Sequence, residues 1–268
     1  MRALVIGDVF SDSGTKAAEA YLRDNRDHLE PDIVVANAEN ASSRGAGLSK
    51  AAALTLFNAG VDVITLGNHT FRNPDIYGML KEYEHVIRPV NYPEGAPGKG
   101  ATVFYTNRGA VGIINLLGRL YLDACDCPFL AAEREIAKIQ EKTNMIIIDM
   151  HAEATSEKKA LAYCVDGSCS LFTGTHTHVQ TADEQILPGG TAFITDIGMT
   201  GPADGVIGVK REIAVRRFRT LLPERYMPAE GRSQFNAVIA DIDEESGKAI
   251  SINRINTLSD EIYNNSRG

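Results

Sequence analysis

The stretch MIIIDMH, residues 145–151, has four apolar residues in a row before Asp149 and ends in His151. A short, unbroken apolar run is typical of a strand that is buried on both faces of its sheet. Similar runs recur along the chain: ALVI from residue 3, IVVA from 33, VDVITL from 61, VGIINLL from 111, SLFT from 170 and AFIT from 192. The sequence therefore predicts a core built on buried strands.

Helical patterns with recognisable end signals lie between these runs. Ser49 precedes the apolar pattern at 50–59 and Gly60 follows it, while prolines open the patterns at 74–83 and 128–142. Serine caps helix starts, proline suits the first helical turn, and glycine often follows the last turn. The alternation of strands and helices indicates a layered α/β fold.

The C-terminal part has a different pattern. Residues 234–243 and 248–256 flank the turn sequence EESG, which predicts an antiparallel hairpin. We expect residues 264–268 to be frayed. No repeat or low-complexity linker divides the chain, so residues 1–268 are expected to form a single domain.

Polar residues follow most of the predicted strands. In open α/β sheets, ligands bind at the carboxyl ends of the strands, so these residues should meet at one edge. A single acid or amide there is usually a turn or helix cap, but four of the six histidines fall at such ends. The other two, His28 and His85, lie in polar, helix-like stretches and are expected at the surface. The strand-end residues are Asp8, Glu39, Asn40, Asn68, His69, His151, His176, His178 and Asp196.

The sequence GTHTHVQ, residues 174–180, contains two histidines two positions apart. On a regular strand they would point to opposite faces, so a shared site requires a loop, which Gly174 makes plausible. Together with the other strand-end residues, they supply enough ligands for two metal ions. Oxygen and imidazole ligands without cysteine suit Mn²⁺, Fe²⁺ or Zn²⁺, and a two-metal site attracts phosphate.

Composition limits the classes of partner. With 35 acidic and 27 basic residues the formal charge is −8, which argues against binding to polymeric nucleic acid and favours a small ligand. The four cysteines form no CxxC pair, which favours reduced thiols. The chain has no apolar run of membrane-spanning length and no signal-peptide core, so we expect a cytoplasmic protein without a membrane partner.

Several motifs together resemble a known family. GDVF at 7–10, NAENA at 37–41, TLGNHTF at 65–71, DMHAEATSEK at 149–158 and the segment 174–202 resemble the YmdB-like branch of calcineurin-like metallophosphoesterases. The resemblance spans nearly the whole chain. It implies a four-layer α/β/β/α sandwich with a strand-end active site and a homo-oligomer. The implied activity is hydrolysis of 2′,3′-cyclic nucleotides, with 3′,5′-cyclic nucleotides as further candidate substrates. The nucleophile would be a hydroxide bound to two divalent metal ions. Iron and manganese are the first candidates for these ions, and zinc is the alternative.

The resemblance also implies residue roles. Asp8, Glu39, Asn40 and His178 would bind one ion. Glu39 would bridge to a second ion bound by Asn68, His151 and His176, and His69 would donate a proton to the leaving alkoxide. The broader superfamily has a histidine where Phe10 stands and a GDxxD block where this chain has NAEN. Roles known from protein phosphatases therefore transfer poorly.

Other residues have two open interpretations. Residues 42–47 form either a phosphate loop or ordinary turns, and Asp149 and Glu153 either orient the histidines or serve as a strand-end and a helix-start acid. Asp196 either lines the pocket or turns the chain. The basic residues Lys210, Arg211, Arg216, Arg217 and Arg219 fit a solvated helix face better than an RNA groove. The alternative functions are a phosphomonoesterase or nucleotidase, and a nucleotide-binding regulator without turnover.

Overall fold

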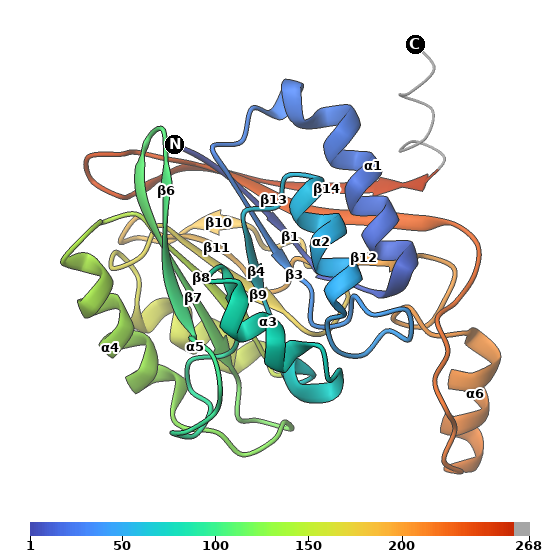
Figure 1. Ribbon diagram of the computed structural model, residues 1–268. Coiled ribbons are helices and arrows are strands. Elements are labelled where there is room, and N and C mark those ends of the chain that lie inside the picture. The colour runs from blue at the N-terminus through green and yellow to red at the C-terminus, as the bar shows by residue number, and fades with distance from the viewer. Residues whose placement is uncertain (260–268) are drawn as a thin grey trace.

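Two sheets packed face to face form the centre of the protein (Figure 1). The computed structural model describes residues 1–259, so the expected fraying of 264–268 lies outside the described residues. The first sheet has the order β2-β12-β13-β1-β3-β4-β5, and β14 pairs with β13 outside this order. Its strands are β1 (Arg2–Ile6), β2 (Asp8–Val9), β3 (Ile33–Asn37), β4 (Val63–Thr65), β5 (Val86–Ile87), β12 (Met199–Pro202), β13 (Ser233–Ile242) and β14 (Ala249–Leu258).

The second sheet has the order β10-β11-β9-β8-β7-β6. Its strands are β6 (Ala101–Thr106), β7 (Gly109–Leu117), β8 (Ile146–His151), β9 (Leu171–Thr175), β10 (Gln185–Ile186) and β11 (Ala192–Ile194). Strands β7, β8, β9 and β11 run parallel, as do β1, β3, β4 and β5 of the first sheet. Within each sheet, the carboxyl ends of the parallel strands therefore share one edge.

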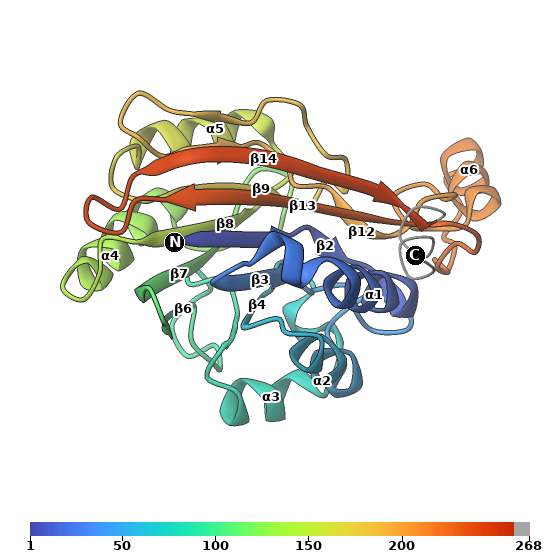
Figure 2. The same cartoon turned by 90° about the horizontal axis from the view of Figure 1, so that it is seen from above.

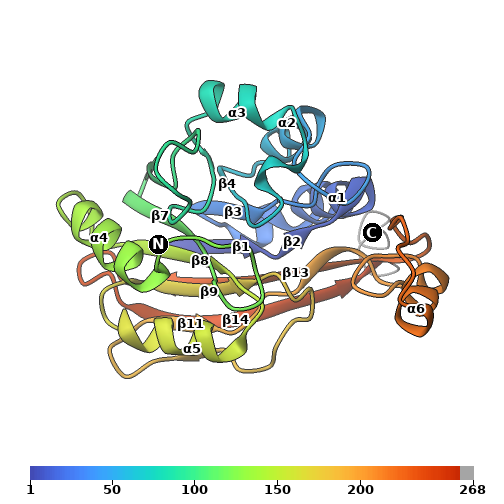
Figure 3. The ribbon, with the colours of Figure 1, turned by 90° about the horizontal axis from the view of Figure 1, so that it is seen from below.

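Helices cover the outer face of each sheet (Figures 2 and 3). One side carries α1 (Ser11–Leu29), α2 (Lys50–Asn58) and α3 (Ile76–Glu82), and the other carries α4 (Pro128–Gln140) and α5 (Thr155–Cys164). Between the sheets, side chains such as Val5, Val35, Ile113 and Ile147 form an apolar core. The predicted four-layer α/β/β/α sandwich is confirmed.

All seven apolar runs form strands, and β13 pairs with β14 as the predicted hairpin. The Ser49 side chain accepts a hydrogen bond from the Ala52 amide at the start of α2, as its capping role requires. Helix α3 begins at Ile76, two residues after the predicted start, because residues 74 and 75 form a turn. His85 is half-buried before β5 rather than in a helix, and its ring contacts Thr102.

The sixth α-helix, α6 (Arg211–Thr220), extends away from the sandwich (Figure 1). Four of the five basic residues singled out in the sequence lie on it, and Lys210 directly precedes it. All four are exposed, in agreement with a solvated helix face. Within residues 1–259, no helix combines the length and apolar character needed to cross a membrane.

Candidate metal centre

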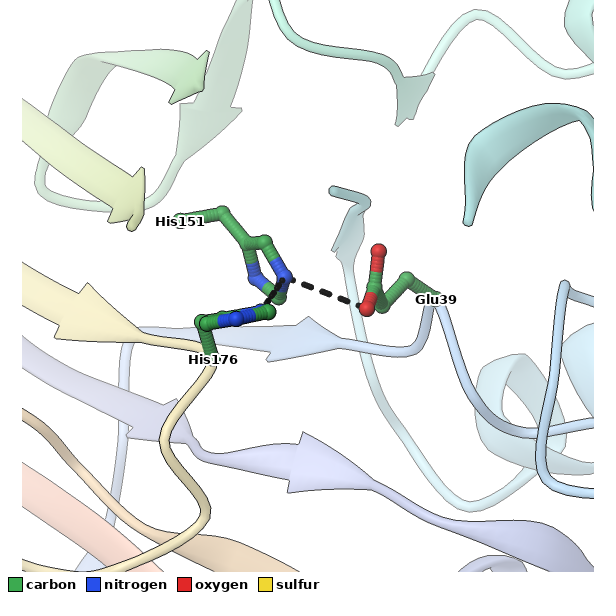
Figure 4. A group of neighbouring side chains, drawn as sticks. All are labelled: Glu39, His151 and His176. Carbon is green, nitrogen blue, oxygen red and sulfur yellow. Dashed lines mark hydrogen bonds and ion pairs between the residues drawn. The ribbon is translucent and has the colours of Figure 1, made fainter. Parts of the chain in front are cut away.

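Three side chains from different strand ends converge on one point (Figure 4). Glu39 follows β3, His151 ends β8 and His176 follows β9. His151 Nε2 lies 3.1 Å from Glu39 Oε1 and 3.0 Å from His176 Nδ1. Asn68, in the turn after β4, places its Oδ1 3.1 Å from the same Nε2 atom. Four potential ligand atoms from four strand ends therefore surround a small volume.

Neighbouring residues fix the orientation of the His151 ring. The Thr175 hydroxyl donates to Asp149 Oδ1 at 2.8 Å, so its oxygen is free to accept from His151 Nδ1 at 3.0 Å. Asp149 is itself buried and also accepts from Asn37. The acid thus orients His151 through Thr175, and the ring directs Nε2 toward Glu39.

The His176 ring is oriented from the solvent side. Its Nε2 atom lies 3.1 Å from the carboxylate of Glu153, which leaves Nδ1 facing His151. Of the two acids considered as orienting groups, Glu153 therefore serves His176, and Asp149 serves His151 through an intervening hydroxyl.

This set of atoms fits a cation. When His151 Nδ1 donates to Thr175 and His176 Nε2 donates to Glu153, the other nitrogen of each ring carries a lone pair. These two nitrogens, His151 Nε2 and His176 Nδ1, face each other and the Glu39 carboxylate. Ligands about 2.1 Å from one ion and at right angles to each other lie about 3.0 Å apart, close to the separations found here. A proton or a metal ion has to join these atoms, and oxygen–imidazole ligand sets of this kind bind divalent metals.

A second cluster lies on the other side of Glu39. Asp8 is fully buried at the start of β2, and His178 Nε2 lies 3.9 Å from its carboxylate. Asn40 Nδ2 lies 3.1 Å from Glu39 Oε1, 3.4 Å from Asp8 Oδ1 and 3.5 Å from His178 Nε2. A ligand role for Asn40 requires its oxygen at this position, which a half-turn of the amide provides. Glu39 Oε1 borders both clusters, as a bridging ligand must.

The electrostatics of the pair of clusters favour added positive charge. Burial lowers the pKa of His151, but the carboxylates of Glu39 and Asp8 raise it to about 9. Burial alone would raise the pKa of Glu39, yet the adjacent His151 and His69 rings hold it well below its usual range. Burial and the neighbouring His151 lower the pKa of His176 to about 3, so its ring is neutral. Neutral imidazole is the form that binds metals.

His69 lies against Glu39, with its Nδ1 3.4 Å from Glu39 Oε1. Its backbone amide donates to Glu39 Oε2 at 2.8 Å, and its Nδ1 lies 2.7 Å from Asn40 Oδ1. The ring also lines the pocket above the site, where Nε2 has no partner among the described residues. His69 can therefore face a ligand in the pocket, whereas the preceding residue, Asn68, can bind an ion.

The loop after β9 carries His176 and His178 in left-handed backbone conformations, with φ of 101° and 66°. Only such a loop lets both rings face the same site, as the sequence required. Asp196 holds it: its Oδ2 accepts from the amide and hydroxyl of Thr177, between the two histidines, at 3.1 and 2.8 Å. Lys158 donates to the same oxygen at 2.7 Å, and both side chains are fully buried.

Two glycines create the space for this arrangement. Gly174 lies within β9 rather than in the loop, and a Cβ there would come within 1.8 Å of Thr195 O and 2.7 Å of Lys158 Cδ. At Gly67 a Cβ would lie 2.4 Å from both Glu39 Oε2 and the His151 ring. Any side chain at either position would displace the residues that form the site.

A pocket of about 650 Å³ opens above the clusters. Arg44 and Arg72 line it, both exposed and without a side-chain partner among the described residues. The loop at 42–47 therefore contributes to the pocket through Arg44, Gly45 and Ala46. The sequence did not single out Arg72, although it lies in the turn that follows the GNH motif and could have been noticed there.

Comparison with known proteins identifies the family. The YmdB-like protein family matches residues 4–255. The chain belongs to this family. A "2',3'-cyclic-nucleotide 2'-phosphodiesterase" from Bacillus subtilis is 44% identical over 263 residues, covering 98% of this chain and 99% of the relative.

Solved structures extend the comparison. A "novel phosphatase" from Mycoplasma pneumoniae superimposes with a TM-score of 0.90 at 32% identity, covering 100% of this chain and 96% of that one. A putative 5'-nucleotidase from Staphylococcus aureus gives a TM-score of 0.62 at 14% identity, covering 95% of this chain and 53% of that one. This last likeness concerns the fold alone. The YmdB-like assignment from the sequence motifs is confirmed.

Proposed function

We propose that the protein is a metal-dependent phosphodiesterase that hydrolyses small cyclic nucleotides, 2′,3′-cyclic ones first and 3′,5′-cyclic ones as further substrates. The convergence of carboxylate, amide and imidazole ligand atoms at the floor of a nucleotide-sized pocket carries this proposal. The activity named for the relative from Bacillus subtilis, which is 44% identical, supports it.

Two groups of residues would hold two divalent ions, with iron or manganese as the first candidates and zinc as the alternative. The first group is Asp8, Glu39, Asn40 and His178, and the second is Glu39, Asn68, His151 and His176. The two clusters on either side of Glu39 Oε1 favour this division. Divalent ions in such a site supply a hydroxide near neutral pH and neutralise charge on a phosphate.

The remaining roles belong to the side chains around the pocket. Arg44 and Arg72 would bind the non-bridging phosphate oxygens, since guanidinium groups match phosphate geometry. His69 Nε2 would protonate the leaving ribose oxygen, because an imidazole in contact with the pocket can deliver a proton to that atom. Thr175 and Glu153 would hold the two ligand rings in the orientation that exposes the correct nitrogen.

The deciding experiment compares three substrates with metal-loaded protein: 2′,3′-cyclic AMP, 3′,5′-cyclic AMP and AMP. We expect turnover of the 2′,3′-cyclic substrate to exceed that of AMP by at least about tenfold in kcat/KM, since a dedicated diesterase should discriminate by more than one kcal/mol. Preferential release of phosphate from AMP would support the nucleotidase alternative. Tight binding of all three without turnover would support a regulator.

The bridging role of Glu39 makes a prediction about metal content. Glu39→Gln should weaken both sites, because its Oε1 atom borders both clusters, whereas Asp8→Ala should mainly weaken the first. Elemental analysis after dialysis measures the ions retained per chain. Two ions retained in the Glu39→Gln protein would contradict the bridging assignment.

Three broader expectations stay predictions. These are the single domain at 1–268, the cytoplasmic location and the homo-oligomeric state. The exposed apolar side chains Phe218, Leu221 and Leu222 on and after α6 support an oligomer, since such groups are often buried by association.

A further inference from the structure

The pocket above the metal centre has two chemically different parts. Arg44 and Arg72 form a cationic part, and the floor carries the candidate ligands. The rest is largely apolar, and we call it the apolar wall: it consists of Phe10, Ile207, Val209, Tyr226 and Met227. A site that recognised phosphate alone would need only the cationic part and the floor.

Most of the apolar wall belongs to an arm, residues 206–229, that carries α6 at its far end (Figure 1). The two ends of the arm are joined by backbone hydrogen bonds, from Lys210 N to Met227 O at 2.9 Å and from Ala229 N to Gly208 O at 2.8 Å. This pairing fixes Tyr226 and Met227 beside Ile207, although nearly twenty residues of chain separate them.

Ile207 has a conformation that β-branched residues rarely adopt. Its φ is 47°, in the left-handed region, and it forms a tight turn in which Val206 and Val209 exchange two backbone hydrogen bonds. Its carbonyl accepts from His178 Nδ1 at 2.9 Å, which leaves His178 Nε2 for the metal centre. Backbone strain of this kind commonly occurs at ligand sites. The same residue thus links the apolar wall to the metal centre.

The wall is exposed where it meets the pocket. Ile207, Tyr226 and Met227 have 53%, 44% and 49% of their surface accessible. Arg217 lies 4.9 Å from the centre of the Tyr226 ring, a cation–π contact that favours a defined ring position. An aromatic ring held in place beside a phosphate-binding floor provides a stacking surface for a flat apolar group.

We propose that the apolar wall binds the nucleobase of the substrate, with Tyr226 as its stacking residue. This inference rests on the proposed function, because it assumes that the phosphate occupies the metal centre beside Arg44 and Arg72. A nucleoside cyclic phosphate has the matching combination of an anionic end and a flat aromatic end. Stacking is tolerant of base identity, so the wall distinguishes nucleotides from base-free cyclic phosphates more than one base from another.

The test uses two substrates that differ only in the base: 2′,3′-cyclic AMP and the 2′,3′-cyclic phosphate of methyl ribofuranoside. For Tyr226→Ala we expect KM for 2′,3′-cyclic AMP to rise about 5- to 100-fold, the range that loss of one base-stacking contact produces, with kcat within about twofold. KM for the base-free substrate should change less than about twofold. Tyr226→Phe keeps the ring and should restore the parent KM.

Tyr163→Ala is the matched control, since Tyr163 is a tyrosine on α5 that is 58% exposed and does not line the pocket. It should leave both substrates unaffected. An equal rise in KM for both substrates with Tyr226→Ala, or no rise for either, would overturn the proposal. Light scattering of the variants detects the other possible occupant of the wall: a lower mass together with an equal loss on both substrates would mean that a second copy of the chain covers it.

Calorimetry with adenosine and metal-free protein separates this inference from the proposed function. Binding that weakens in Tyr226→Ala supports the base site even if no cyclic nucleotide is hydrolysed. Hydrolysis of cyclic nucleotides combined with adenosine binding that is the same in parent and Tyr226→Ala protein would retain the proposed function and reject the base site.

Discussion

Replacing His69 with alanine should lower turnover of 2′,3′-cyclic AMP by about 10²–10⁴-fold, the usual contribution of a general acid, while the bound ions are retained. The ring lies at the pocket, and its Nδ1 contacts Asn40 Oδ1 at 2.7 Å. The backbone amide that donates to Glu39 persists in the variant, so the carboxylate proposed to bridge the ions keeps a partner. The substitution therefore removes a proton donor without removing a candidate ligand.

The leaving group provides the control for this prediction. A nitrophenoxide departs without a proton, so the loss should be much smaller for bis(4-nitrophenyl) phosphate than for the cyclic nucleotide. His28→Ala, which changes an exposed histidine on α1, should leave both rates unaffected. Equal losses on the two esters, or loss of metal from His69→Ala in elemental analysis, would contradict the role of proton donor.

The sequence was informative about the strands and their carboxyl ends because both are local features. An apolar run such as MIII at 145–148 identifies a buried strand by itself, and the polar residue that follows it can be recognised without knowledge of the partner strand. Parallel pairing brings Glu39 and Asn68 to one edge of the first sheet, and His151 and His176 to one edge of the second. The expected single edge is therefore two edges, which the packing of the sheets brings together.

Other features depend on contacts between distant segments. Thr175 orients His151 across 24 positions, and neither residue type nor spacing marks it as a partner. The sequence predicts helix only around His28, and it does not predict the start of α1 because Ser11 follows Phe10 without a capping side chain. Gly174 was read as a loop residue, whereas its role is to let β9 approach Thr195 O and the stem of Lys158.

The structure of the arm at 206–229 also depends on contacts between distant segments. Its basic residues identified α6 correctly as a solvated helix, since a run of charged residues is visible in the sequence. The contribution of Tyr226 and Met227 to the pocket depends on backbone pairing between Lys210 and Met227, which no local sequence pattern predicts. The residues proposed to bind the base are therefore harder to find in the sequence than the candidate metal ligands, because their place in the pocket depends on the fold rather than on residue type.

Lys158→Met should destabilise the protein by about 3–5 kcal/mol, the usual cost of leaving one member of a buried ion pair without its partner. Lys158 and Asp196 are both fully buried and lie 2.7 Å apart, and methionine fills similar space without the charge. For a chain of this size we expect a fall in Tm of about 10 °C, measured on metal-free protein so that ion binding does not contribute. Lys159→Met is the matched control: the Lys159 side chain is 43% exposed and its Nζ lies 3.5 Å from Asp183, so the change should stay within about 0.5 kcal/mol. Because Asp196 also holds Thr177 between His176 and His178, the Lys158 variant should in addition retain metal less tightly than the Lys159 variant.

Adding Asp196→Asn to Lys158→Met should restore part of the lost stability, since the double variant buries no charge. Equal unfolding free energies for the two single variants would show that the buried pair does not anchor the loop that carries the two histidines.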